Sequence, residues 1–203
     1  MVLMPDYDPV VTKVTTGDNA INSYVIVDPM TAKGVIVDAP SDPSAVFEQT
    51  HGMEIQSILI THTHLEQMEG LDWLREITGA TVWVNAIDAN VFNYFTPVNS
   101  IRPENPFHAG VVIPCGNMEI KVIHTPGHTP GSSCYVIGRH LFSGHAVFDH
   151  SKQDLTPENL DQSIQSVVHN LFVLPDDVIV HTSNGADSTM LDIRSMYRSF
   201  SGH

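Results

Sequence analysis

Residues 60–70 read ITHTHLEQMEG, with His62 and His64 two positions apart at the end of an apolar run. Side chains alternate along an extended chain, so both rings point to the same side and can converge on one ion. A second stretch, HTPGHTPGSS at 124–133, holds His128 between two Pro-Gly turns that fix the backbone on either side. A rigid loop that presents one imidazole suits a metal ligand. Together the two stretches permit a metal site.

The composition limits the classes of protein to which this chain can belong. At 203 residues and 42% hydrophobic, it is long enough to bury one substantial core, so we expect a single domain over residues 1–203. The formal net charge of −14 repels phosphate backbones and anionic membranes, which disfavours nucleic acid as a substrate. Histidine is frequent, with 12 residues against 9 lysines and arginines together, and this excess calls for a chemical explanation.

The cysteines and the N-terminal sequence favour a cytoplasmic location. Cys115 and Cys134 are too few for a disulfide framework and form no CxxC pair, so we interpret both as core residues. The N-terminal MVLMPDYDPV lacks a basic region followed by an apolar stretch, and no segment approaches the ~18 apolar residues of a membrane span. We therefore expect a small-molecule substrate, with no nucleic-acid or membrane partner. The sequence does not indicate the oligomeric state.

Strand-like and helix-like segments alternate along the chain, which predicts a mixed α/β fold. Runs rich in β-branched residues predict strands at 10–15, 21–28, 34–38, 55–60, 81–85, 111–114, 118–124, 132–138, 140–144 and 176–181. Capping residues before amphipathic segments predict helices at 41–50, 68–78, 157–171 and 187–200. Residues 86–110 predict a helix followed by a surface loop. Two successive blocks of strands with flanking helices indicate two sheets covered by helices.

At these motifs the chain resembles the metallo-β-lactamase-fold hydrolase superfamily over nearly its whole length. The likeness rests on THTHLEQMEG, which is similar to the family pattern T-H-x-H-x-D-H-x-x-G, on TPGHTPG, on LFSGHAVF and on VIVHTSNG, all in the family's order. The early segments NSYVIVD and GVIVDAP also match, with Asp38 at a usually acidic position. The resemblance implies a four-layer αβ/βα sandwich of the α/β class, in which two mixed β-sheets are flanked by helices.

The resemblance also implies a set of metal-binding positions. These are His62, His64 and His128 in the first site, Glu66, Gln67 and His181 in the second site, and His145 at the position that bridges the two. The family has Asp at position 66, His at 67 and Asp at 145, so this chain departs from the pattern at these positions. Gln67 offers only a neutral amide oxygen, and His145 cannot bridge two ions as Asp does. We therefore expect the second site to be weak or empty.

The first site is a three-imidazole set that suits zinc, with iron or manganese as alternatives. A fourth position open to water would make that water a nucleophile near neutral pH. If His145 takes the fourth position instead, four imidazoles close the shell and the ion becomes structural unless its coordination expands. A further possibility is that His145 fills the vacated second site without binding metal.

Glu66 stands where the family's Asp binds metal and positions the attacking water. It can either reach a metal or act as a general base, and we favour the base. Glu66 and Gln67 can also be read as polar residues that cap the following helix. An iron dioxygenase would require a carboxylate at position 145, which His145 does not supply unless Asp149 takes that part.

The function predicted on this basis is a metal-dependent hydrolase. Its substrate would be a small ester, thioester, lactone or similar molecule, with one firmly bound zinc and Glu66 as the candidate catalytic base. A glyoxalase II assignment is disfavoured, because too few residues follow His181 for that family's C-terminal helical domain. The alternative is a non-catalytic or degenerate protein of the same fold that binds or senses a ligand with one metal or none. The altered positions 66, 67 and 145 motivate this alternative.

Overall fold

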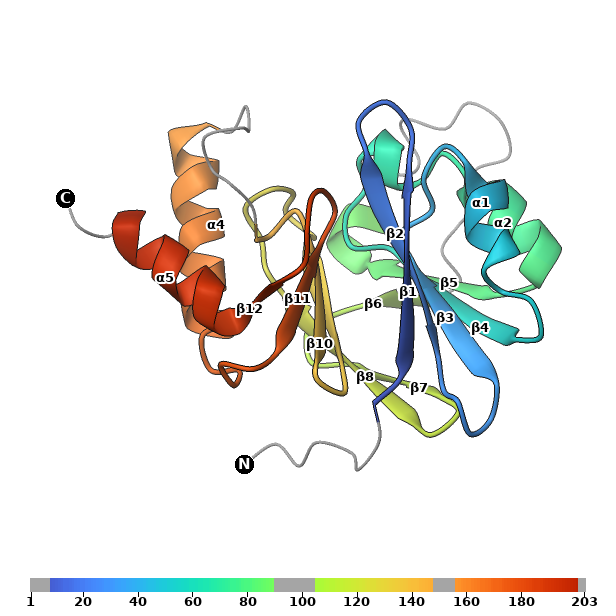
Figure 1. The fold of residues 1–203 in the computed structure, drawn as a ribbon. Helices are drawn as coiled ribbons and strands as arrows, with labels where there is room; N and C mark the ends of the chain where they lie inside the picture. The colour runs from blue at the N-terminus through green and yellow to red at the C-terminus, as the bar shows by residue number, and fades with distance from the viewer. Residues whose placement is uncertain (1–7, 90–104, 148–155, 201–203) are drawn as a thin grey trace.

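The computed structural model describes residues 8–89, 105–147 and 156–200 of the chain (Figure 1). Within these ranges, two six-stranded β-sheets pack face to face, and helices cover the outer face of each sheet (Figure 1). Each sheet contains both parallel and antiparallel pairs. This architecture confirms the predicted α/β four-layer sandwich.

The first sheet has the order β1-β2-β3-β4-β5-β6. Its strands are β1 (Val10–Thr16), β2 (Ile21–Val27), β3 (Lys33–Val37), β4 (Glu54–Leu59), β5 (Thr81–Asn85) and β6 (Asn105–Phe107). The first three strands pair antiparallel, and β3 to β6 pair parallel through crossovers that include α1 (Pro43–Glu48) and α2 (Leu71–Thr78). Because the carboxyl ends of parallel strands meet at one edge of a sheet, the segments that follow β3, β4 and β5 emerge together.

The second sheet has the order β12-β11-β10-β9-β8-β7. Its strands are β7 (Val112–Cys115), β8 (Met118–His124), β9 (Ser133–Ile137), β10 (His140–Gly144), β11 (Ile179–Thr182) and β12 (Ser188–Thr189). Strands β10 and β11 are parallel and the other neighbours are antiparallel, so β8, β10 and β11 run in the same direction. Helices α4 (Pro157–Asn170) and α5 (Met190–Phe200) cover its outer face (Figure 1).

Three layers of apolar side chains hold the sandwich together. The central layer lies between the sheets and includes Tyr24, Leu59, Tyr135 and Phe142. A second layer packs the first sheet against α1 and α2, and a third packs the second sheet against α4 and α5. Cys115 is buried in the central layer and Cys134 in the third, which confirms both as core residues.

Two buried tyrosines tie the sheets together beside the segments that follow β4 and β11. The Tyr24 hydroxyl, from the first sheet, donates to the carbonyl of Thr182 in the second sheet at 2.7 Å. The Tyr135 hydroxyl, from the second sheet, donates to the carbonyl of Ile60 at 2.7 Å. Each bond satisfies a backbone acceptor that would otherwise be costly to bury. The segments that carry the candidate site are therefore fixed relative to each other.

Several segments differ from the elements that the sequence predicts, and β11, for example, begins at Ile179 instead of residue 176. Helix α2 begins at Leu71 instead of residue 68, because Leu65–Gln67 form a separate 3₁₀ turn, η1. Asn105–Phe107, within the predicted surface loop, pair with β5 as β6. Helix α5 begins at Met190, because Ser188–Thr189 pair with β11.

The predicted helix that follows β5 is described over residues 86–89 only. The rest of it lies outside the described residues. Among the described helices, none is long and apolar enough to cross a membrane.

Candidate metal centre

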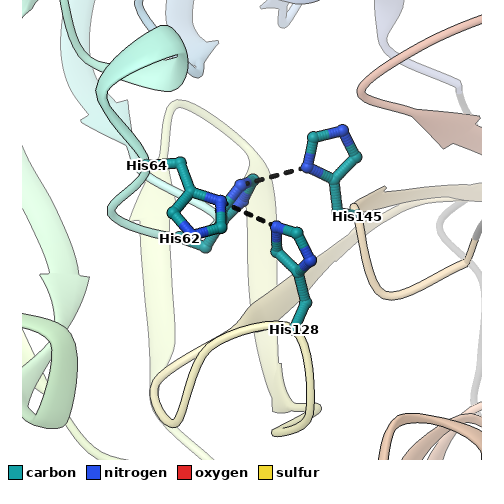
Figure 2. Close-up of side chains that lie close together, drawn as sticks. All are labelled: His62, His64, His128 and His145. Atoms are coloured by element: carbon teal, nitrogen blue, oxygen red, sulfur yellow. Dashed lines mark hydrogen bonds between the residues drawn. The ribbon is translucent and has the colours of Figure 1, made fainter. Parts of the chain in front are cut away.

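Four histidines converge where the two sheets meet. His62 and His64 follow β4, His128 lies in the loop between β8 and β9, and His145 follows β10 (Figure 2). One ring nitrogen from each lies within 4.8 Å of the others. In the described part of the chain, this is the one group of histidine, cysteine or acidic side chains placed to hold a metal ion. The structure thus brings together four of the predicted ligands, which we call the histidine ring.

The members of the histidine ring pack directly on one another. The centroids of neighbouring imidazoles are 4.5 Å apart for His64 and His128 and 5.0 Å apart for His62 and His64. His128 Nε2 lies 2.8 Å from His64 Nδ1, and His145 Nδ1 lies 3.1 Å from His62 Nε2 (Figure 2). His62 is buried, His128 and His145 are half-buried, and His64 is exposed. The ring is therefore open to solvent on the His64 side.

Asp38 and Thr61 orient the buried member of the ring, His62. The Thr61 hydroxyl lies 2.9 Å from Asp38 Oδ2 and 2.9 Å from His62 Nδ1. When Asp38 is ionised, its carboxylate only accepts, and both the backbone N–H and the hydroxyl of Thr61 donate to it, so that hydroxyl accepts from the Nδ1–H of His62. This arrangement leaves the lone pair of His62 on Nε2, which faces the other histidines. Burial raises the pKa of Asp38 to about 7, while the hydrogen bonds from Thr61 oppose that rise.

Asp88, which the sequence did not single out, holds the loop that carries His128. It is buried in the helical turn that follows β5. One carboxylate oxygen accepts from the Thr129 hydroxyl at 2.7 Å, and the other accepts from the backbone N–H of Gly131 at 2.6 Å. Bonds on both sides of the second Pro-Gly turn fix the loop against the first sheet.

Helix α4 holds the same loop from the other side. The Ser166 hydroxyl donates to the carbonyl of Pro126 at 2.6 Å, and the Asn170 amide donates to the carbonyl of His124 at 3.1 Å. The His128 loop is therefore clamped between α4 and Asp88, which gives its imidazole a fixed position.

Burial keeps the inner imidazoles neutral. It holds the pKa of His62 well below its ordinary value, and the neighbouring histidines lower the pKa further. Burial also lowers the pKa of His145, against opposing effects of Asn184 and Glu66. Neutral imidazole is the form that binds metal, so the protonation state suits an ion.

The donor set also fits zinc. Four imidazole nitrogens that approach one another this closely match the nitrogen ligands that zinc accepts, whereas magnesium and calcium prefer oxygen. The cluster contains no thiolate and no carboxylate among its ligating atoms. The histidine ring therefore fits a single ion of the zinc type.

Glu66 and Gln67 lie beside the ring and outside its ligand set. The Asn19 amide donates to the Glu66 carboxylate at 3.3 Å. Gln67 is fully buried, and its amide nitrogen and oxygen have no hydrogen-bond partner among the described residues. Helix α2 begins at Leu71 after the N-cap residue Gly70, and no side chain caps it, so the reading of Glu66 and Gln67 as helix caps is wrong.

His181 also lies outside the ring. It points into the space between the sheets, where it stacks on Phe142 with centroids 4.7 Å apart. Its Nε2 lies 2.9 Å from His140 Nδ1, and its Nδ1 lies 3.2 Å from an oxygen of Asp187. Nε2 thus makes a hydrogen bond, whereas the buried Nδ1 lies near Asp187 without one. Asp149, the residue on which an iron dioxygenase would depend, lies outside the described residues.

Comparison with known proteins identifies the family. The profile of the metallo-beta-lactamase superfamily matches residues 16–183. The chain belongs to this superfamily. This confirms the resemblance drawn from the histidine motifs, and it places the histidine ring in a family of metallo-hydrolases.

Individual proteins are similar to this chain at low identity. An uncharacterized protein of Aquifex aeolicus is 27% identical over 206 residues, which cover 95% of this chain and 97% of that protein. A probable polyketide biosynthesis zinc-dependent hydrolase, BaeB, of Bacillus velezensis is 28% identical over 127 residues, covering 62% of this chain and 54% of its own length. The crystal structure of the BLEG-1 B3 metallo-beta-lactamase has a TM-score of 0.82 at 21% identity, covering 95% of this chain and 100% of that one. This last likeness shows the fold.

Asn184, like Asp88, is a site residue that the sequence analysis did not identify. Its side-chain oxygen lies 2.6 Å from His145 Nε2, on the side of that ring away from His62. It follows β11 by two positions and His181 by three. A search of the polar residues that follow each strand at this edge would have included it, together with Asp88 after β5.

Gly127 tests whether α4 positions the superfamily's Pro-Gly loop. A Cβ on Gly127 would lie 2.5 Å from the Ser163 backbone, so Gly127→Ala must push the loop away from α4. We expect a loss of about 1–3 kcal/mol in the free energy of unfolding, from overpacking and backbone strain together. Denaturant unfolding measures this loss.

The matched control is Gly110→Ala. Gly110 also has a positive φ, but no atom lies within 4 Å of the position that its Cβ would take, so it reports backbone strain alone. Equal losses for the two variants would contradict a steric role for the contact with α4.

His140 and His181 predict a pH-dependent stability. Burial lowers the pKa of both below the ordinary value of 6.5. The unfolded chain then binds protons at these two positions that the folded chain does not, so their contribution to the free energy of unfolding should decrease as the pH falls below 6.5. The double variant His140→Gln, His181→Gln should flatten this decrease in chelator-treated protein. Identical pH profiles for the two proteins would contradict this account.

Proposed function

We propose that the chain is a zinc-dependent hydrolase of a small ester, thioester, lactone or similar electrophile. The observation that carries this proposal is the convergence of His62, His64 and His128, from two separate motifs, with ring nitrogens within 4.8 Å. The superfamily and a relative named as a zinc-dependent hydrolase support the reaction class. The fold alone does not choose among the substrates.

The residues divide the work between holding an ion and moving a proton. His62, His64 and His128 would hold the ion. When bound, zinc supplies Lewis acidity and lowers the pKa of a coordinated water toward neutrality. Glu66, half-buried beside the ring, accepts a proton as the general base. Its interaction with His145 and its contact with Asn19 keep the carboxylate at the edge of the ring.

A second candidate function is a non-catalytic binding or sensing protein. The specific observation in its favour is the fourth imidazole, because His145 stands in the ring where a hydrolase needs room for water. In this case the same histidines hold one ion, or none, and no substrate is turned over. The two candidates differ in turnover.

Metal content is the first test of the proposal. Protein purified without added metal should contain about one zinc per chain by elemental analysis, and His64→Ala should lower that content. The control is His51→Ala, since His51 is exposed just after α1 and contacts Phe47 instead of the ring. If the protein neither contains nor takes up zinc, the hydrolase proposal is contradicted. One zinc without hydrolysis of an ester and thioester panel would favour the binding protein.

Glu66→Gln tests the general base. A positioned base contributes about 10²–10⁴-fold to the rate, so kcat should fall by that factor while zinc content stays the same. The matched control is Glu69→Gln, an exposed carboxylate of the same segment, which should keep full turnover. Near-wild-type kcat in Glu66→Gln with unchanged zinc would remove Glu66 from the mechanism.

A further inference from the structure

The amide of Asn184 has one orientation that its surroundings allow. Its Nδ2 lies 2.9 Å from the carbonyl oxygen of Asn19 and 3.3 Å from that of Ala20. Carbonyl oxygens only accept, so the NH₂ group must face them. The side-chain oxygen of Asn184 therefore faces His145, where it lies 2.6 Å from Nε2.

The loop that carries Asn184 is itself fixed to the first sheet. The backbone N–H of Asn22 donates to the carbonyl of Ser183 at 2.7 Å. The Asn22 side chain donates to the carbonyls of Thr182 and Gly185, each at 3.0 Å. Asn184 thus sits in the middle of a segment that is held on both sides. Its amide is a rigid acceptor for His145.

A rigid acceptor decides which nitrogen of His145 carries the proton. The Asn184 oxygen cannot donate, so Nε2 of His145 must be the N–H. In the neutral ring, Nδ1 then carries the lone pair. Nδ1 is the atom that faces the other three histidines, 3.1 Å from His62 Nε2 (Figure 2).

The atom of His62 that faces His145, Nε2, also carries a lone pair. With Asp38 ionised, the Nδ1–H of His62 is directed at Thr61, whose hydroxyl donates to the Asp38 carboxylate. Two lone pairs that face each other at 3.1 Å repel unless a cation lies between them. The hydrogen bonds behind both rings therefore prepare this pair of nitrogens for a shared positive charge.

We propose that Asn184 is a positioning residue that makes His145 the fourth imidazole donor of a single-ion centre. The inference rests on the metal binding of the proposed function, because it concerns the same ion, and turnover would then need a fifth coordination position for water beside the four imidazoles. It assigns to His145 a ligand role in place of the space-filling role, and to Asn184 the support that such ligands have behind them. The centre then holds one ion with four neutral imidazoles, and Glu66 remains outside the ligand set.

A matched pair of variants isolates the acceptor on His145. Asn184→Leu and Asn184→Asp both remove the NH₂ group that donates to Asn19 and Ala20, but only the Asp variant keeps an acceptor for the Nε2–H of His145. Any difference between them therefore reports that acceptor together with the negative charge of Asp, and not the lost contacts with Asn19 and Ala20. Zinc affinity is measured on full-length, chelator-stripped protein by competition with a chromophoric chelator.

We expect zinc to bind about 10–100-fold more weakly to Asn184→Leu than to the wild type, and Asn184→Asp to recover most of the loss. Asn19→Ala is the control, because it keeps the backbone carbonyl that orients Asn184 and loses only the contact with Glu66. Its zinc affinity should equal that of the wild type. Equal affinities for the Leu, Asp and wild-type proteins would overturn the role of Asn184.

Chemical rescue tests the ligand role of His145 directly. His145→Gly should bind zinc more weakly than the wild type, and free imidazole should restore the affinity in this variant alone. A wild-type protein that binds no zinc defeats the proposed function and this inference together. One tightly bound zinc in the wild type, with the same affinity in His145→Gly and no effect of imidazole, overturns the inference and leaves a three-histidine hydrolase intact.

Discussion

The face-to-face packing of two β-sheets is the interaction on which the rest of the structure depends. It buries the central apolar layer, and it brings the carboxyl ends of β3, β4 and β5 against those of β8, β10 and β11. The tyrosine bonds from Tyr24 to Thr182 and from Tyr135 to Ile60 lock this arrangement beside the histidine ring. Without this packing, His62 from one sheet and His145 from the other would not lie close together. The metal centre is thus a property of the interface and not of either sheet.

The histidines at this interface are supported by polar residues that do not themselves bind metal. Each inner imidazole is backed by a polar group that fixes its proton or its position: Asp38 through Thr61 for His62, Asp88 for the His128 loop, and Asn184 for His145. Such support is costly, because Asp38 and Asp88 are buried carboxyls that give up hydration. A buried carboxyl is retained at this cost only where its hydrogen bonds are complete. The identities of these supporting residues are therefore constrained in the same way as those of the candidate ligands.

Local rules account for what the sequence could predict. His62 and His64 alternate along an extended segment, and two Pro-Gly turns fix His128, so their directions follow from the backbone alone. Asp88 and Asn184 act across 41 and 39 residues, and nothing in the neighbouring sequence indicates those contacts. His181 illustrates the limit. Its place after a strand suggests the site, but it stands in register with Phe142 and therefore faces the space between the sheets.

The departures from the family pattern are physically consistent with one another. Two dications close together need carboxylates to offset their repulsion, and this chain replaces the bridging Asp by His145 and a second-site His by Gln67. Both changes remove what a second ion needs. At the same time, His145 gains an acceptor, Asn184, that aims its free nitrogen at His62. Loss of ligands by drift would not supply a fixed partner for the replacement. The replacements at positions 67 and 145 therefore agree with the proposed single-ion centre.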